Sequence, residues 1–345
     1  MHKIRLGKTN LWVSALGFGG IPIQRLSEEE AVRVVRRCLD LGVTFLDTAH
    51  GYTTSEERIG KAIAGRREGL VLATKSHALS GEALRQEMEQ SFQRLGVQHI
   101  DLFQFHNIST EEQYAKVTAP GGPLDVAREA QAAGRIGHIG VTSHNLRMAC
   151  KLVASGQFES MMFPFCFVTP EPLEELIPLC RQHDVAFIAM KPMGGGLLEN
   201  ATLAIKYLRQ FPDILPLVGM QAVSEVEELV SLMAGPAELS AAERAEMARI
   251  AQELGTRFCR GCDYCQPCRQ GISISGVMRL RSHAKRFPLE RFYGEWGRAL
   301  IAKAETCADC GECEERCPYN LPIREVMREN IAWYHEQMAL QKEPR

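Results

Sequence analysis

Short apolar runs alternate with longer amphipathic segments over the first 235 residues of the chain. This alternation is typical of parallel β-strands that are joined by helical crossovers. One such helix is predicted over residues 27–41, where Ala31, Val34 and Val35 keep the helical period behind the cap candidate Ser27. The eight predicted strands cover residues 13–18, 43–48, 70–75, 100–106, 138–142, 160–165, 186–191 and 215–220.

Eight strand and helix pairs in about 230 residues match a (β/α)8 TIM barrel, whose usual length is about 250 residues. We therefore predict an α/β chain with this barrel over residues 1–236, a connecting helix over 237–256 and a small α-helical domain over 257–335. Ser240 and Gly255 are the predicted cap and end of the connecting helix. A doubly wound open sheet is the alternative, but the Gly-x-Gly-x-x-Gly turn that it needs is absent after the first strand.

Eight of the twelve cysteines lie in the last quarter of the chain, in two runs of four. The runs are Cys259, Cys262, Cys265 and Cys268, and then Cys307, Cys310, Cys313 and Cys317. Two such sets in a long chain are typical of the ligands of two [4Fe-4S] clusters in an electron-transfer module. Structural zinc sites usually pair two short Cys-x2-Cys knuckles, so zinc is the weaker alternative. Disulfides would be expected behind a signal peptide, which the polar residues 1–10 do not resemble.

The second run, Cys-x2-Cys-x2-Cys-x3-Cys-Pro, resembles the motif of bacterial two-cluster ferredoxins. The first run differs because its last cysteine comes one residue earlier and is followed by Arg269. In ferredoxins of this kind the fourth cysteine of each run ligates the other cluster. The resemblance implies a dicluster ferredoxin-like domain in which Cys317 completes the first cluster and Cys268 the second. Residues 271–274 and 320–323, which follow the two runs, are alike and indicate an internal duplication.

The remaining composition is that of an ordinary globular protein. The chain has 345 residues, of which 45% are hydrophobic and 24% charged, and a formal net charge of -2. This charge argues against nucleic acid or an anionic membrane as a partner, and no apolar run is long enough to cross a bilayer. Four scattered cysteines are expected to be buried free thiols, namely Cys38, Cys150, Cys166 and Cys180. We expect a soluble protein of the reducing cytoplasm.

Reactive side chains lie at the ends of three adjacent predicted strands. The second strand leads to Asp47 and Tyr52, the third ends at Lys75, and the fourth ends at His106. In a barrel the carboxyl ends of the strands meet at one rim, where catalytic groups are found. The phenol of a free tyrosine has a pKa of about 10. It therefore transfers protons poorly at neutral pH unless a nearby ammonium stabilises its phenolate. A carboxylate partner would keep a buried lysine charged for this purpose.

These four residues resemble the catalytic tetrad of the aldo-keto reductases. The resemblance extends over residues 42–49, 51–52, 55–56, 100–102, 139–141 and 192–196. It implies that Tyr52 is the general acid for a carbonyl oxygen and that Lys75 lowers the pKa of Tyr52. It also implies that Asp47 holds Lys75 and that His106 orients the carbonyl. The chain would then be an oxidoreductase that reduces a small carbonyl compound or oxidises an alcohol.

The family binds a nicotinamide dinucleotide across the barrel mouth, and this chain keeps the contact positions only in part. By resemblance the contacts are Thr142, Ser143, Met162, Met190, Gly194, Gly219 and Glu228. Met162 replaces a customary glutamine, and Met190 replaces a tyrosine that stacks on the nicotinamide. Leu229 replaces an asparagine near the adenine, and Glu225 replaces an arginine that meets the 2′-phosphate. Because a carboxylate repels a phosphate dianion, NAD is expected to be favoured over NADP.

Three functions remain open from the sequence. The first is a nicotinamide-dependent carbonyl reductase or alcohol dehydrogenase that carries the cluster module. The second is a reductase that receives electrons through the clusters from a ferredoxin-like partner or a flavin. The third is an electron-transfer subunit with the barrel as a scaffold, although a scaffold has no need of a buried lysine–aspartate pair. A docking patch or a solvated helical face are both compatible with the basic residues Arg279, Arg281, Lys285, Arg286 and Arg291.

Overall fold

The structure, a computed structural model, describes residues 1–342 and contains two compact units. The first unit is Met1–Glu243 and the second begins at Arg244. Helix α10 (Ala241–Gly255) spans this division and lies within the range predicted for the connecting helix. The predicted domain limits at residues 236, 256 and 335 stay predictions. None of the described helices combines the length and the hydropathy that a bilayer span requires.

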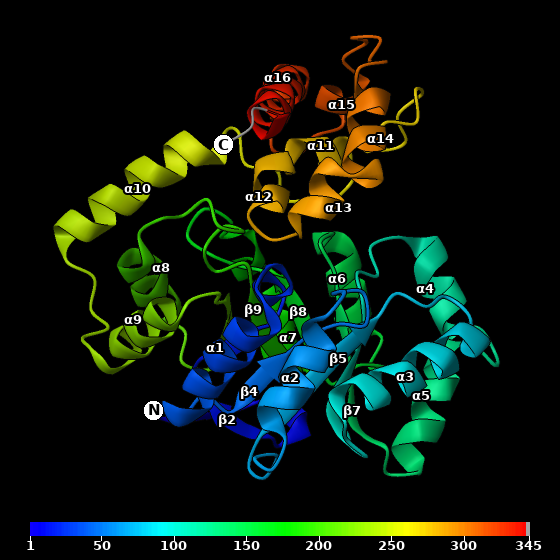
Figure 1. Ribbon diagram of the computed structural model, residues 1–345, viewed down its shortest axis with the longest axis vertical. Helices are drawn as coiled ribbons and strands as arrows, with labels where there is room; N and C mark the ends of the chain where they lie inside the picture. The colour runs from blue at the N-terminus through cyan, green and yellow to red at the C-terminus, as the bar shows by residue number, and fades with distance from the viewer. Residues whose placement is uncertain (343–345) are drawn as a thin grey trace. The chain divides into compact units, whose positions relative to one another are not determined.

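Eight parallel strands form a closed barrel in the first unit, as the sequence predicted (Figure 1). Their order around the barrel is β10-β3-β4-β5-β6-β7-β8-β9. Both faces of these strands are buried, one in the barrel interior and one under the helices. Their sequences are therefore nearly continuous apolar runs. The strands are β3 (Gly17–Gly19), β4 (Phe45–Asp47), β5 (Val71–Ser76), β6 (Ile100–Phe105), β7 (Ile136–Thr142), β8 (Ser160–Pro164), β9 (Ala186–Met190) and β10 (Leu215–Gly219).

Helices connect successive strands and cover the outside of the barrel (Figure 1). The predicted start of α1 is confirmed, since Ser27 Oγ accepts from the Glu30 N–H and the Glu30 carboxylate accepts from the Ser27 N–H. The α-helices are α1 (Glu28–Asp40), α2 (Ser55–Ile63), α3 (Gly81–Leu95), α4 (Glu111–Thr118), α5 (Pro123–Ala132), α6 (Leu146–Ala154), α7 (Leu176–Gln182), α8 (Ala201–Leu208) and α9 (Val223–Ala234). Short 3-10 helices cover Gly7–Thr9, Pro22–Arg25 and Glu171–Leu173.

The first predicted strand, residues 13–18, is wrong in its limits because it is divided between two strands. Strand β2 (Trp12–Ser14) pairs antiparallel with β1 (Lys3–Arg5), and only β3 belongs to the barrel. The side chain of Ser14 donates to the Leu16 carbonyl at 2.7 Å, which stabilises a bend between β2 and β3. Strand β1 was not predicted, because it has three residues and one buried position. That is too short to show the alternation of apolar and polar residues that indicates a strand.

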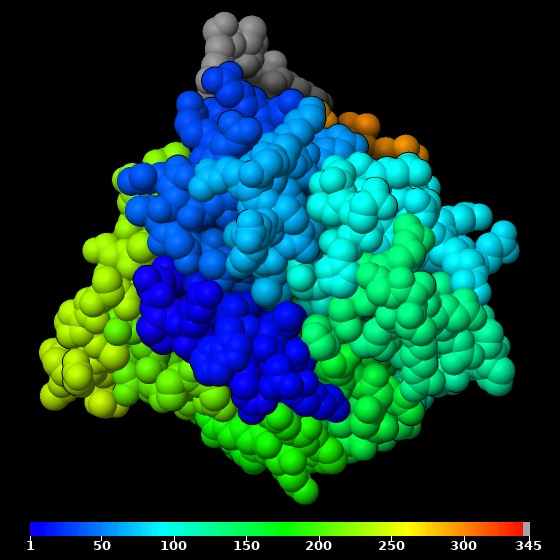
Figure 2. Space-filling view, turned by 90° about the horizontal axis from the view of Figure 1, so that it is seen from below, coloured from blue at the N-terminus to red at the C-terminus, as the bar shows by residue number. Residues whose placement is uncertain are grey.

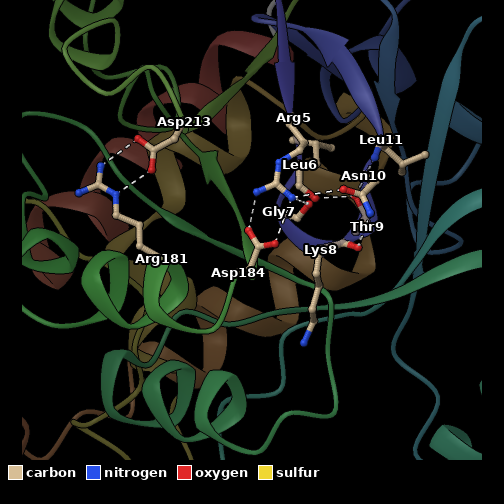
Figure 3. A network of polar contacts seen from close by, with 10 residues as sticks. All are labelled: Arg5, Leu6, Gly7, Lys8, Thr9, Asn10, Leu11, Arg181, Asp184 and Asp213. Carbon is tan, nitrogen blue, oxygen red and sulfur yellow. Dashed lines mark hydrogen bonds and ion pairs between the residues drawn. The ribbon is translucent and has the colours of Figure 1, made fainter.

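Polar contacts hold this hairpin against the loop before β9 (Figure 3). Arg5 pairs with both carboxylate oxygens of Asp184, at 2.8 and 3.0 Å, and the Lys8 N–H donates to the Asp184 carbonyl at 2.6 Å. Gly7 has a positive φ of 47°, and a Cβ there would lie 2.4 Å from that carbonyl oxygen, so the turn requires glycine. Figure 2 shows the amino-terminal segment, in dark blue, lying across one face of the barrel unit.

The second unit is α-helical (Figure 1, orange and red). Its apolar core includes Cys265, Val277, Cys317 and Met327, so two of the predicted cluster cysteines belong to the core. The predicted cap of α10 is confirmed, since Ser240 Oγ accepts from the Glu243 N–H at 3.2 Å. The remaining helices are α11 (Ile274–Met278), α12 (Leu280–Ala284), α13 (Leu289–Tyr293), α14 (Glu295–Ala304), α15 (Glu312–Glu315) and α16 (Ile323–Lys342).

Candidate functional site

Asp47 and Lys75 come from neighbouring strands and form a buried ion pair. Lys75 Nζ lies 2.5 Å from Asp47 Oδ2 and also donates to the Thr48 carbonyl at 2.6 Å. The exposed fractions of the two residues are 2% for Asp47 and 1% for Lys75. Gln104 of β6 donates from Nε2 to Asp47 Oδ1 at 3.1 Å, so both carboxylate oxygens accept a hydrogen bond.

Two opposing effects act on the pKa of the Asp47 carboxyl. Burial raises the pKa of the Asp47 carboxyl, and the Lys75 ammonium and the Gln104 amide act against that effect. An isolated buried carboxylate or ammonium would be costly, because neither has water to solvate it. With the opposite charge 2.5 Å away, the ionised form of each group stabilises the other. We therefore expect an Asp47 carboxylate and a Lys75 ammonium in the folded barrel.

Tyr52 and His106 lie beside this ion pair. Lys75 Nζ is 5.1 Å from the centroid of the Tyr52 ring, and the rings of Tyr52 and His106 meet edge to face with centroids 5.7 Å apart. Tyr52 belongs to the loop between β4 and α2, where its N–H donates to the Ala49 carbonyl at 2.9 Å. The structure thus brings together all four residues that the sequence predicted for the acid–base site.

The surroundings of His106 favour a neutral imidazole. Burial, His77 and Lys75 all lower the pKa of His106 well below its ordinary value. Its Nδ1 is buried and has no hydrogen-bond partner among the described residues. A neutral imidazole carries one N–H group, which can donate to a carbonyl oxygen.

The first predicted nicotinamide contacts lie at the carboxyl ends of β7, β8 and β9. Thr142 Oγ1 already accepts from the Asn107 N–H at 2.8 Å, whereas Ser143 Oγ lies 3.2 Å from the hydroxyl of Ser109. Met162 is 2% exposed and packs inside the barrel, and Met190 is partly buried at the end of β9. Ser143 Oγ also accepts from the Asn145 N–H at 3.2 Å and donates to the Asn145 carbonyl at 3.3 Å, so both hydroxyls already have partners within the protein.

The other predicted contacts occupy the loops after β9 and β10. Gly194 begins three successive glycines with positive φ, and a Cβ on Gly219 would lie 2.7 Å from Pro22 Cγ. Glu228 is exposed on α9, whereas Leu229 is 4% exposed and packs into the barrel core. Glu225 accepts from the Gln221 N–H at 2.7 Å, so its carboxylate also holds the loop that begins α9.

The eight predicted cluster cysteines surround two cavities in the second unit. Cys317 lines the first cavity together with the first three cysteines of the first run. Cys268 lines the second cavity together with the first three cysteines of the second run, and Cys265 reaches both. This is the exchange that the ferredoxin resemblance implies. Four thiols in each proposed set match the donor type of a [4Fe-4S] cluster, and ligation itself stays a prediction.

The two cysteine runs share a backbone conformation. Residues on both sides of the second cysteine of each run have positive φ, namely Gly261 (76°), Asp263 (60°), Asp309 (54°) and Gly311 (83°). The turns after the runs also agree, since the N–H of Gly271 donates to the Cys268 carbonyl and that of Asn320 to the Cys317 carbonyl. Matching conformations at matching positions support an internal duplication.

The basic residues between the runs make contacts within the second unit. The guanidinium of Arg281 lies 5.4 Å from the ring centroid of Trp333. That of Arg291 lies 4.9 Å from Phe287 and 5.5 Å from Trp296. These cation–π contacts give the arginines a structural role, and a docking role for them stays a prediction.

Sequence reasoning missed the roles of Gln104 and His77. Gln104 contacts Asp47, and the ring of His77 stacks on that of His106 with centroids 3.9 Å apart. A signal for both was present, because residues two apart in a strand face the same side. Gln104 is two residues before His106, and His77 is two residues after Lys75.

Comparison with known proteins agrees with this fold and site. The model of the aldo/keto reductase family matches residues 15–214, and that of the 4Fe-4S dicluster domain matches residues 258–322. The chain belongs to the aldo-keto reductase family. It is an oxidoreductase whose family acts on small carbonyl compounds, and it carries a carboxyl-terminal 4Fe-4S dicluster domain.

The chain is also similar to curated relatives and solved structures. The chain is 26% identical over 298 residues to an uncharacterized oxidoreductase, YqkF, of Bacillus subtilis, with 81% of this chain and 93% of the relative covered. Aldo-keto reductase AKR11C1 of Bacillus halodurans shares the fold with a TM-score of 0.63 at 24% identity, covering 72% of this chain and 96% of that one. An aldo-keto reductase of Klebsiella pneumoniae in complex with NADP and acetate has a TM-score of 0.59 at 20% identity, covering 73% and 96%.

Proposed function

We propose that this chain reduces a small carbonyl compound, or oxidises the corresponding alcohol, with Tyr52 as general acid and base. The position of the Lys75 ammonium carries the proposal, because it lies 2.5 Å from Asp47 Oδ2 and 5.1 Å from the Tyr52 ring centroid. A poorly solvated ammonium at this distance favours the phenolate over the phenol. Tyr52 can then release and recover a proton near neutral pH.

His106 would position the substrate for this proton transfer. Its neutral ring can donate one N–H to the carbonyl oxygen that also accepts from the Tyr52 hydroxyl. Two donors at one oxygen fix the orientation of the carbonyl and stabilise the negative charge that develops there. The low pKa of His106 keeps its ring neutral for this role.

A nicotinamide dinucleotide would supply the hydride when bound. Ser143 would offer its hydroxyl to the carboxamide, and the backbone N–H groups of the glycines at 194–196 and 219 are candidates to meet the phosphates. We propose a preference for NADH on the basis of the Glu225 carboxylate, although the relative from Klebsiella pneumoniae holds NADP and lends that preference no support.

Nucleotide binding tests this part of the proposal. NADH is expected to bind at least about tenfold more tightly than NADPH, because a carboxylate beside the 2′-phosphate opposes binding. Calorimetric titration of the holoprotein with each nucleotide measures the ratio. Glu225→Lys should favour NADPH, and Glu225→Gln, which keeps an acceptor for the Gln221 N–H, serves as its control. Binding of neither nucleotide by the wild type would contradict the nicotinamide-dependent function.

The eight cysteines of the second unit would hold two [4Fe-4S] clusters, which carry single electrons when bound. We propose one ligand set of Cys259, Cys262, Cys265 and Cys317, and another of Cys268, Cys307, Cys310 and Cys313. The cavities that these sets line support the assignment. A chain with twelve cysteines and oxygen-sensitive clusters belongs in the reducing cytoplasm, which we propose as its compartment.

Double substitutions distinguish these sets from sets made of each run alone. One lost ligand is expected to lower iron from about eight to about four atoms per chain, because each cluster holds four. Cys259→Ser with Cys317→Ser should lose no more iron than either change alone, whereas Cys307→Ser with Cys317→Ser should leave almost none. Iron and acid-labile sulfide are measured after anaerobic purification. Equal iron in the two double variants would refute the exchange, and Cys150→Ser in the barrel is the control.

A second function is favoured by Met162 and Met190, which offer neither an amide nor an aromatic ring to a nicotinamide. In that function electrons would enter through the clusters from a ferredoxin-like partner or a flavin, and Tyr52 would supply only the proton. Measuring NADH-driven turnover in a variant that lacks both clusters distinguishes the nicotinamide-dependent function from the cluster-fed function. Undiminished turnover favours the nicotinamide enzyme, and its complete loss favours the cluster-fed reductase. An electron-transfer subunit, the third possibility, would show no effect of Tyr52→Phe on any activity.

A further inference from the structure

Two imidazole rings stack face to face in the candidate active site. The ring centroids of His77 and His106 are 3.9 Å apart, and the ring planes differ by 16°. This stack follows from the pairing of β5 with β6, in which Ser76 lies opposite Phe105. His77 and His106 are the next residues along each strand, and the His106 N–H continues the ladder by donating to the Ser76 carbonyl at 2.8 Å.

His106 needs such a neighbour because its ring lacks the usual means of orientation. A catalytic histidine is commonly fixed by a hydrogen bond from one ring nitrogen to a carboxylate or a carbonyl. Nδ1 of His106 is buried without such a partner among the described residues. Among the described residues, the aromatic contacts of its ring are the stack with His77 and the edge contact with Tyr52.

The His77 ring is itself well anchored. The backbone of His106 lies beside it and raises the pKa of His77 in part. The preceding residue, Ser76, donates from its hydroxyl to the Glu87 carboxylate at 2.5 Å, which ties the end of β5 to α3. On the other side, His77 Cδ2 lies 3.8 Å from the position that a Cβ on Gly51 would occupy, so the ring also borders the loop that carries Tyr52.

We propose that His77 is a positioning residue, which holds the His106 ring in the plane that presents its N–H to the carbonyl oxygen of the substrate. This inference rests on the proposed function, in which His106 orients the carbonyl. The role depends on the flat face of His77 and not on proton transfer by it. A phenyl ring should therefore replace His77 better than any small side chain.

The cationic and titratable groups around the stack disfavour a proton on its rings, and Glu87 acts against them. Lys75 on β5 disfavours a proton on either ring, and His50 in the loop after β4 disfavours one on His77. Glu87 on α3 favours a proton on His77 and is the acidic group on that side. Burial remains the largest effect and lowers the pKa of both histidines. A stack of two neutral rings is the state that these groups support.

His77→Ala and His77→Phe test the proposal in the full-length holoprotein. Reduction of 4-nitrobenzaldehyde with NADH or NADPH gives kcat and KM, and nitrogen-15 NMR of the histidine rings follows protonation of His106. His77→Ala should lower kcat about tenfold with little change in KM, because a displaced His106 acts on bound substrate. His77→Phe should stay within about threefold of wild type. His99→Ala, a change of an exposed histidine, is the control.

Protonation of His106 provides a readout that does not depend on turnover. It should occur at the lowest pH in wild type, where protonated His77 opposes a second proton on the stack. It should occur at a higher pH in His77→Phe, which cannot be protonated, and at the highest pH in His77→Ala, because the His106 ring also becomes solvated. The same protonation behaviour in all three proteins would overturn the proposal. So would an unchanged kcat in His77→Ala, or a kcat in His77→Phe as low as in His77→Ala.

Tyr52→Phe, measured in the same assay, separates this inference from the function on which it rests. Loss of turnover in Tyr52→Phe with none in His77→Ala overturns the role of His77 alone. Full turnover in Tyr52→Phe overturns the proposed function itself.

Discussion

Tyr52→Phe is expected to lower kcat/KM for carbonyl reduction by about three orders of magnitude. The substitution removes only the hydroxyl oxygen, so the ring can keep its contacts with Lys75 and His106. General acid catalysis by a positioned side chain contributes roughly 10²- to 10⁴-fold, and Tyr52 is the proposed donor. The measurement is steady-state reduction of 4-nitrobenzaldehyde by the wild type and the variant at equal iron content.

Tyr114→Phe on α4 is the matched control for this substitution. Tyr114 contacts Lys151 through its ring, with 5.3 Å between the ammonium and the centroid, so it also combines a phenol with a lysine. It belongs to no part of the candidate site, and its substitution should leave kcat/KM unchanged. Equal rates for Tyr52→Phe and Tyr114→Phe would rule out Tyr52 as the acid.

Asp47→Leu is expected to lower the free energy of unfolding of the barrel by about 3–5 kcal/mol, because it leaves the Lys75 ammonium buried without its counter-ion. Both side chains are almost fully buried, so water cannot replace the lost partner. Adding Lys75→Met should restore most of the stability, since no buried charge remains. Activity should stay absent in the double variant. Denaturant unfolding followed by circular dichroism gives the stabilities, and the same preparations give the rates.

The exposed ion pair of Arg85 and Glu129 is the control for this experiment. Its side chains are 57% and 61% exposed. Glu129→Leu should therefore cost at most about 1 kcal/mol, as for other solvated pairs. A similar loss in Asp47→Leu and Glu129→Leu would show that the Asp47–Lys75 pair is not buried as described.

Most of the barrel could be predicted because its strands are covered on both faces and read as apolar runs. The first strand could not be placed, since the bend after Ser14 interrupts an otherwise apolar stretch without a glycine–proline turn signal to mark it. The candidate tetrad could be predicted from positions at strand ends, where the family resemblance gave each residue a role. The exchange of Cys268 and Cys317 between the two cysteine runs likewise came from resemblance. In the structure Cys317 lines the first cavity and Cys268 lines the second.

Alternation within a strand indicates which side chains share a face, but contacts between strands depend on register and could not be predicted. Lys75 lies opposite Gln104, and this pairing places the Gln104 amide against Asp47. The stack of His77 on His106 has the same origin. A one-residue change of register would separate these side chains without altering any local pattern in the sequence. Burial of Leu229 also depends on which face α9 turns toward the barrel.

Ionisation of the seven tyrosines tests the central claim most directly. Carbon-13 labelling of the phenol carbon lets NMR follow each tyrosine as the pH rises, and Tyr52→Phe identifies the signal of Tyr52. Burial raises the pKa of Tyr207 and of Tyr334, so these two should lose their protons late. Tyr52 should lose its proton before the other six, and Lys75→Met should abolish that lead. Ionisation of Tyr52 together with or after the other tyrosines, with Lys75 in place, would contradict the account.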